Sequence, residues 1–134
     1  MISRRGGVPC KVLIVEDDEG VAMMLRFCLQ RAGFDVVRFP AGNQALRALD
    51  ERAPDAVVLD IGLPNSRTGV FLDRLMEIER EEDSAPVWVA LSALDRGEVA
   101  RLYGPLEGHF LAKPFDPWDL VRSLGKMLSA KDGR

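Results

Sequence analysis

Apolar residues of this chain come in short runs separated by segments with a helical period. The runs lie at residues 12–15, 36–39, 56–59, 87–91 and 109–111, and valine is frequent in them. Short apolar runs of this kind are typical of parallel strands that are covered on both faces. We therefore predict a strand at each of the five runs.

Between the runs, apolar residues recur every three or four positions, which predicts helices. Gly33 follows the first helical pattern as a C-terminal stop, and the pattern at 98–103 is short. Asp116 and Pro117 are typical of an N-cap and a first helical position. The apolar positions of the four longer helices are Val21, Met24, Leu25, Cys28 and Leu29; Ala45, Leu46, Leu49 and Ala53; Phe71, Leu72, Leu75 and Ile78; and Val121, Leu124 and Leu128.

Strands that alternate with helices predict an α/β fold, a doubly wound five-stranded parallel sheet with helices on both faces and right-handed crossovers. In the flavodoxin-like strand order 2-1-3-4-5, strands 1 and 3 flank the switch point where ligands bind. We assign residues 11–128 to this single domain. Residues 1–10 and 129–134 are expected to be terminal tails.

Composition narrows the functional classes. A chain of 134 residues accommodates one domain, and its net charge of -3, with 18 scattered basic residues, argues against direct nucleic-acid binding. The first ten residues lack a signal-peptide pattern, and no run of about 18 apolar residues predicts a membrane span. We expect a cytoplasmic protein in which Cys10 and Cys28 are reduced structural residues, because their spacing fits no metal or redox motif.

Polar residues follow four of the predicted strands. The acidic segment 16–18 comes after the first, Asp60 after the third, Ser92 after the fourth and Lys113 after the fifth. Because the carboxyl ends of parallel strands meet at one edge of a sheet, these side chains are expected to converge near the switch point.

Carboxylates that are forced together repel one another unless a cation or a proton compensates. Magnesium prefers hard oxygen ligands and retains several waters, so it suits a site with few protein ligands. We interpret Asp18 and Asp60 as direct ligands of Mg²⁺. The carbonyl of Gly62 completes the protein ligands, and Asp17 acts directly or through a water.

Asp60 is the candidate nucleophile. A carboxylate can attack phosphorus to form an aspartyl phosphate, while a cation and the Lys113 ammonium neutralise the charge of the transferred group. Ser92 offers a hydroxyl donor to that group. No general base is needed, because phosphoryl transfer depends mainly on positioning and electrostatics.

Together these motifs resemble the receiver domain of bacterial two-component response regulators, over roughly Lys11 to Leu128. The segment 113–115, Lys-Pro-Phe, matches the receiver signature, and the resemblance implies a cis bond between Lys113 and Pro114. It also implies that Phe110 and Ser92 form a switch, in which the ring turns inward when the hydroxyl moves toward the phosphoryl group.

The resemblance implies a single-domain response regulator that accepts a phosphoryl group from a histidine kinase or a histidine phosphotransfer protein. It would signal to a downstream effector protein, and it would catalyse only its own phosphorylation and dephosphorylation. The alternative is a receiver domain from a larger DNA-binding regulator or a hybrid histidine kinase. A phosphorylation-dependent homodimer also stays open.

Two other classes fit the residues less well. A haloacid-dehalogenase-like phosphatase needs a second aspartate two residues after the nucleophile, where this chain has Gly62. A flavodoxin-like cofactor binder shares the expected fold, but carboxylates around the switch point would repel a flavin phosphate.

Two spacings depart from the receiver pattern. Gly69 comes one residue later after Asp60 than receivers place it, which predicts an enlarged loop at 64–68. The chain between Ser92 and Lys113 is about one residue short, so the predicted helix at 98–103 and its surroundings differ from those of receivers.

Overall fold

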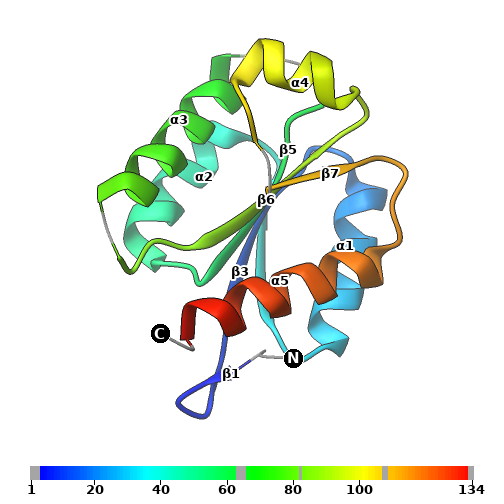
Figure 1. Ribbon diagram of the computed structural model, residues 1–134. Helices are drawn as coiled ribbons and strands as arrows, with labels where there is room; N and C mark the ends of the chain where they lie inside the picture. Colours follow the sequence, from blue (N-terminus) through cyan, green and yellow to red (C-terminus); the bar gives the residue numbers. More distant parts are fainter. Residues whose placement is uncertain (1–3, 63–65, 82, 107–108, 133–134) are drawn as a thin grey trace.

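The structure, a computed structural model, describes residues 4–62, 66–81, 83–106 and 109–132. Within these residues it contains seven strands and five helices (Figure 1). In chain order they are β1 (Arg4–Arg5), β2 (Val8–Pro9), β3 (Lys11–Val15), α1 (Glu19–Arg31), β4 (Asp35–Phe39), α2 (Gly42–Arg52), β5 (Ala56–Asp60), α3 (Ser66–Glu81), β6 (Val87–Ser92), α4 (Arg96–Tyr103), β7 (Phe110–Ala112) and α5 (Pro117–Asp132).

Strands β3 to β7 form one parallel sheet in the order β4-β3-β5-β6-β7. The predicted doubly wound α/β fold is therefore confirmed. The predicted order 2-1-3-4-5 numbered the five strands of this sheet from β3, and with that numbering the observed order is the same. The labels differ because the structure also contains two short strands, β1 and β2, that the sequence did not predict. Strand β3 lies between β4 and β5, and β4 and β7 are the edge strands of this sheet.

Helices cover the sheet on both faces, with α1 and α5 on one side and α2 and α3 on the other (Figure 1). Alternate residues of each strand point to opposite faces, and β3 shows the result. Val12 and Ile14 pack in the cluster with α1 and α5, whereas Leu13 and Val15 pack with α2 and α3. Val99 of α4 joins the second cluster. The sheet is buried between two apolar layers.

The predicted cap of the last helix is confirmed. The Asp116 carboxylate accepts a hydrogen bond from the backbone N–H of Trp118 at 2.9 Å, and α5 begins at Pro117. Gly33, with φ +98°, follows the end of α1, as predicted. The last strand covers Phe110–Ala112 rather than the predicted 109–111.

Both predicted tails contain regular structure. Residues 4–9 form an antiparallel hairpin with a Gly6-Gly7 turn, in which both glycines have positive φ (+58° and +81°). The guanidinium of Arg5 pairs with Asp55 at 2.9 Å and also with Asp132, the last residue of α5. We call these two ion pairs of Arg5, with Asp55 and Asp132, the Arg5 clasp. The sequence did not predict it, because ion pairs between residues so far apart in the chain leave no local signal.

Residues 63–65 of the predicted enlarged loop lie outside the described residues, and α3 begins at Ser66. No helix in the described ranges combines the length and the apolar character that crossing a bilayer requires.

The clasp predicts a measurable effect on stability. Arg5→Ala removes two partly exposed ion pairs and should lower the thermal midpoint by roughly 2–5 °C, with a smaller difference at high salt. Arg4→Ala is the matched control, because the Arg4 side chain bonds only to the carbonyl of Gly7 within the same hairpin among the interactions described. Equal midpoints for the two variants would contradict a stabilising clasp.

Candidate functional site

The carboxyl ends of the strands bring the predicted polar residues to one edge of the sheet. Asp60 ends β5, Ser92 ends β6, and Lys113 directly follows β7. Glu16 directly follows β3, and its backbone N–H donates to the carbonyl of Phe39 at 3.1 Å. Parallel pairing therefore assembles groups that are far apart in the chain, as the sequence predicted.

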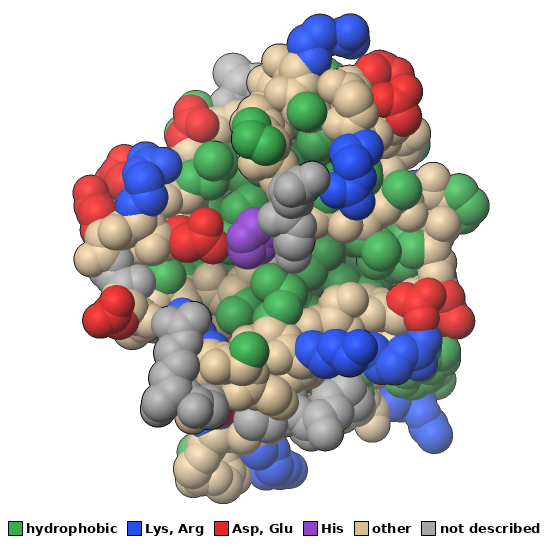
Figure 2. Space-filling model, in the orientation of Figure 1, with side chains coloured by type: hydrophobic (Ala, Val, Ile, Leu, Met, Phe, Trp, Pro, Cys, Tyr) green, Lys and Arg blue, Asp and Glu red, His purple; other side chains and the backbone are tan. Residues whose placement is uncertain are grey.

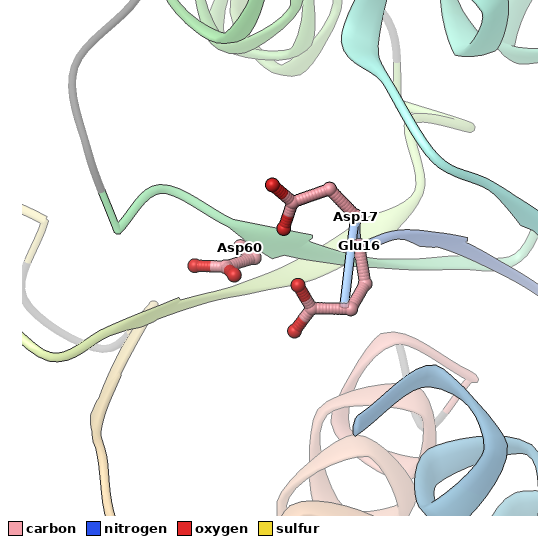
Figure 3. A group of neighbouring side chains, drawn as sticks. All are labelled: Glu16, Asp17 and Asp60. Carbon is pink, nitrogen blue, oxygen red and sulfur yellow. The ribbon is translucent and has the colours of Figure 1, made fainter. Parts of the chain in front are cut away.

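A cluster of three carboxylates lies at this edge. Glu16, Asp17 and Asp60 each place an oxygen within 4.8 Å of the others (Figure 3). The ammonium of Lys113 lies 3.0 Å from Asp60 Oδ2 and 3.5 Å from Glu16 Oε1. Carboxylates alone would repel one another, so this lysine compensates part of their charge.

Asp60 is held from two sides. Its Oδ2 accepts a hydrogen bond from Lys113 Nζ, and its Oδ1 accepts one from the backbone N–H of Gly62 at 2.8 Å. Burial opposes ionisation of Asp60, but hydrogen bonds with Glu16, Lys113 and Gly62 outweigh it and hold the pKa of Asp60 below its usual value. Its side chain keeps 13% exposure, so the ionised carboxylate can be reached from solvent.

Glu16 behaves in the opposite way. Its side chain is only 1% exposed, and burial, followed by the neighbouring Asp60, raises the pKa of Glu16 to about 8 although Lys113 opposes the shift. Near neutral pH and without a cation, Glu16 therefore keeps a proton that it can donate to Asp60. The proton on Glu16 and the ammonium of Lys113 together reduce the electrostatic repulsion among the three carboxylates.

The structure corrects the role expected of Asp18. This residue is exposed and is not part of the carboxylate cluster; its Oδ1 accepts a hydrogen bond from Val21 N at 3.0 Å and caps α1. The sequence contains three consecutive acidic residues at 16–18, and it did not indicate which of their side chains would point toward the carboxylate cluster. Glu16 continues the strand and turns in, whereas Asp18 begins the helix, so Glu16 replaces Asp18 in the set that could hold a cation.

Gly62 fits close against the carboxylate of Asp60. A Cβ added at this position would lie 3.1 Å from Asp60 Oδ1, tighter than most contacts of a real Cβ. The small residue thus lets its own N–H reach the carboxylate. The role of the Gly62 carbonyl as a cation ligand stays a prediction.

Sequence reasoning missed Arg38, which orders the acidic segment. Its Nε donates to the carbonyl of Glu16 at 2.9 Å, and its Nη2 donates to the carbonyl of Asp17 at 3.3 Å. Arg38 lies on β4, beside Ile14 of β3. A charged residue inside an apolar strand was the one available signal, and it did not reveal the partner.

Ser92 is fully buried, and its Oγ accepts a hydrogen bond from Leu94 N at 2.9 Å. A hydroxyl that accepts one bond can still donate its own proton. The half-buried ring of Phe110 packs against the α2–α3 side of the core, under the guanidinium of Arg96 at 5.4 Å from its centroid. The switch that couples these residues stays a prediction. The bond between Lys113 and Pro114 is cis, as the resemblance implied.

Comparison with known proteins agrees with this geometry, since the model of the response regulator receiver domain matches residues 12–125. The chain belongs to this family. It is 31% identical over 122 residues to the DNA-binding response regulator MtrA of Mycolicibacterium paratuberculosis, a match that covers 91% of this chain and 52% of that protein. It is 30% identical over 118 residues to the phosphate regulon transcriptional regulatory protein PhoB of Rhizobium meliloti, covering 88% and 52%.

Solved structures show the same fold. The receiver domain of the Francisella response regulator 1452 superposes with a TM-score of 0.72 at 25% identity, covering 90% of this chain and 98% of that one. The chemotaxis response regulator CheY4 of Vibrio cholerae gives a TM-score of 0.65 at 24% identity, covering 91% and 98%. This receiver domain spans about half the length of the relatives MtrA and PhoB.

As a receiver domain, the protein is a signalling domain of two-component systems. Receiver domains bind Mg²⁺ at an acidic pocket, and the donor set of Glu16, Asp17 and Asp60 fits that ion, because all three offer hard carboxylate oxygens.

The corrected ligand set predicts different effects for adjacent aspartates. Asp17→Ala should weaken Mg²⁺ binding by about tenfold or more, since even outer-shell partners contribute that much. Asp18→Ala should leave Mg²⁺ binding nearly unchanged but lower the free energy of unfolding by about 1 kcal/mol through loss of the cap. Asp18→Ser, which retains a capping oxygen, is the control for stability. Calorimetric titration and urea unfolding measure the two effects, and a larger loss of Mg²⁺ affinity in Asp18→Ala would restore the original assignment.

The raised pKa of Glu16 predicts a pH-dependent stability in the presence of chelator. Between its ordinary value of 4.5 and about 8, the folded protein holds a proton that the unfolded chain has released. Because the folded state binds more protons in this window, the free energy of unfolding falls as the pH rises through it.

Glu16→Gln should therefore flatten the decrease in thermal midpoint between about pH 5 and pH 8, and it should raise the midpoint at the upper end by roughly 3 °C or more. Glu51→Gln, on the exposed surface of α2, is the matched control. Identical pH profiles for wild type and Glu16→Gln would show that Glu16 is ionised throughout.

Proposed function

We propose that this receiver domain accepts a phosphoryl group on Asp60 from a phosphohistidine of a histidine kinase or histidine phosphotransfer protein, with Mg²⁺ as cofactor. The observation that carries the proposal is the position of Asp60. Its carboxylate lies between the Lys113 ammonium and the Gly62 N–H, beside two further carboxylates, and it remains accessible.

The transfer needs few protein groups. An ionised oxygen of Asp60 attacks phosphorus, and the bond between phosphorus and the donor imidazole nitrogen breaks. The electron pair of that bond stays on the nitrogen, and the donor ring, protonated on its other nitrogen, leaves as neutral imidazole. Lys113 then pairs with an oxygen of the transferred group in place of the carboxylate oxygen it holds at 3.0 Å. Glu16 and Asp17, with Asp60 and the Gly62 carbonyl, would hold Mg²⁺, which neutralises charge on the transferred group.

The signal would leave through the face built by α4, β7 and α5. The Ser92 hydroxyl would turn to donate to the phosphoryl group, and Phe110 would move into the space this creates. Figure 2 shows this face, with hydrophobic side chains gathered in the hollow between α4 and α5. Val87, His109 and Met127 line a separate pocket between the start of β6 and the C-terminal half of α5. A downstream effector protein or a second copy of the domain would bind to the face built by α4, β7 and α5.

The relatives favour a second version of this function. MtrA is named a DNA-binding response regulator and PhoB a transcriptional regulatory protein, and the chain matches about half of each. In that version the same face would act on a DNA-binding part of a larger regulator. The domain itself, with its net charge of -3, would make no direct contact with nucleic acid. Both versions place it in the cytoplasm.

The proposed function predicts one phosphorylation site. Incubation with a small phosphodonor such as acetyl phosphate and Mg²⁺ should add a single phosphoryl group to the wild type and none to Asp60→Asn. Asp35→Asn, on the exposed start of β4, is the matched control and should still be modified. Intact-mass measurement at neutral pH detects the product. A labile phosphoryl group on Asp60→Asn would exclude Asp60 as the acceptor.

A further inference from the structure

Tyr103 carries a buried polar atom that the site described above does not use. It is the only tyrosine of the chain and the last residue of α4. Its ring packs against the core cluster shared with α2 and α3, and its hydroxyl oxygen is buried without a hydrogen-bond partner among the described residues. A phenylalanine would pack there without an unpaired hydroxyl. Because a buried hydroxyl without a hydrogen bond is costly, we expect a conformation of the protein in which the Tyr103 hydroxyl is hydrogen-bonded.

The Tyr103 side chain lies close enough to Asp60 for the charge of that carboxylate to act on it. Side chains of a helix slant toward its N-terminus, and α4 begins four residues after Ser92, at the edge of the site. Burial raises the pKa of Tyr103, and the negative charge of Asp60 raises it further. The carboxylate thus favours the protonated hydroxyl, which is the form that can donate a hydrogen bond.

A second side chain of α4 lies beside a residue of the proposed switch. The first residue of this helix, Arg96, stacks on Phe110, a ring with no atom that could respond to a new charge by hydrogen bonding. Tyr103 and Phe110 pack against the same core cluster. The hydroxyl of Tyr103 is therefore well suited to couple the position of α4 to the charge carried by Asp60.

We propose that Tyr103 is a positioning residue whose hydroxyl donates a hydrogen bond to a phosphoryl oxygen on Asp60, directly or through one water, and so ties α4 to the phosphorylated site. This inference rests on the proposed function of Asp60. Phosphorylation places new acceptor oxygens and additional negative charge beyond the carboxylate. The conformation in which the hydroxyl reaches them gains a bond that the unmodified protein lacks, so its population rises.

The single tyrosine permits a direct test. Protein labelled with ¹³C at the tyrosine ring gives one Cζ resonance, whose shift responds to hydrogen bonding of the hydroxyl. Addition of beryllofluoride and Mg²⁺, which mimic the phosphoryl group, should move this resonance in the wild type and leave it unmoved in Asp60→Asn. A purely structural tyrosine would show no such response.

A second measurement tests the energetic link. Tyr103→Phe keeps the ring and removes the hydroxyl, and it should bind beryllofluoride about tenfold or more weakly, as judged by ¹⁹F resonances. Leu102→Ala is the matched control, because Leu102 is exposed on the same helix and should leave the affinity unchanged.

The outcomes separate this inference from the proposed function. If the wild type binds no beryllofluoride, the proposed function fails, and the inference fails with it. If the wild type and Tyr103→Phe bind equally and the Cζ resonance stays in place, only the role of Tyr103 is refuted. A resonance that already indicates a bonded hydroxyl before beryllofluoride is added would also refute it, because a water would then satisfy the group in the unmodified protein.

Discussion

The compensation of carboxylate charge by Lys113 is the interaction on which the site depends. The sheet forces Glu16, Asp17 and Asp60 to one edge, where they would repel one another if all were ionised and unpaired. The ammonium of Lys113 bridges two of them, and the raised pKa of Glu16 keeps a proton in the cluster. This arrangement leaves Asp60 as the ionised member, which is the state a nucleophile requires.

The partial compensation of charge in this cluster also suits the binding of a cation. A group that holds a proton near neutral pH can exchange it for a metal ion, so binding of Mg²⁺ would release the proton of Glu16. Arg38 of β4 fixes the backbone carbonyls of Glu16 and Asp17 through hydrogen bonds.

The two ends of the sheet differ in the kind of polar contacts they carry. At the carboxyl ends of the strands, Ser92 and the Tyr103 hydroxyl are buried polar groups on the same side of the molecule as Asp60. At the opposite end, Arg5 clasps Asp55 and the end of α5 through ion pairs that are open to solvent. The ion pairs of Arg5 therefore stabilise the end of the molecule opposite the proposed phosphorylation site.

The sequence by itself determined the alternation of strands and helices and the convergence of Asp60, Ser92 and Lys113. Parallel pairing makes both readable, because residues that end parallel strands share one edge. Only the tertiary structure decided that Glu16 rather than Asp18 turns into the cluster and that Tyr103 buries an unpaired hydroxyl. Those features depend on the direction of individual side chains and on contacts between distant residues, which neither the period of a pattern nor the spacing of a motif records.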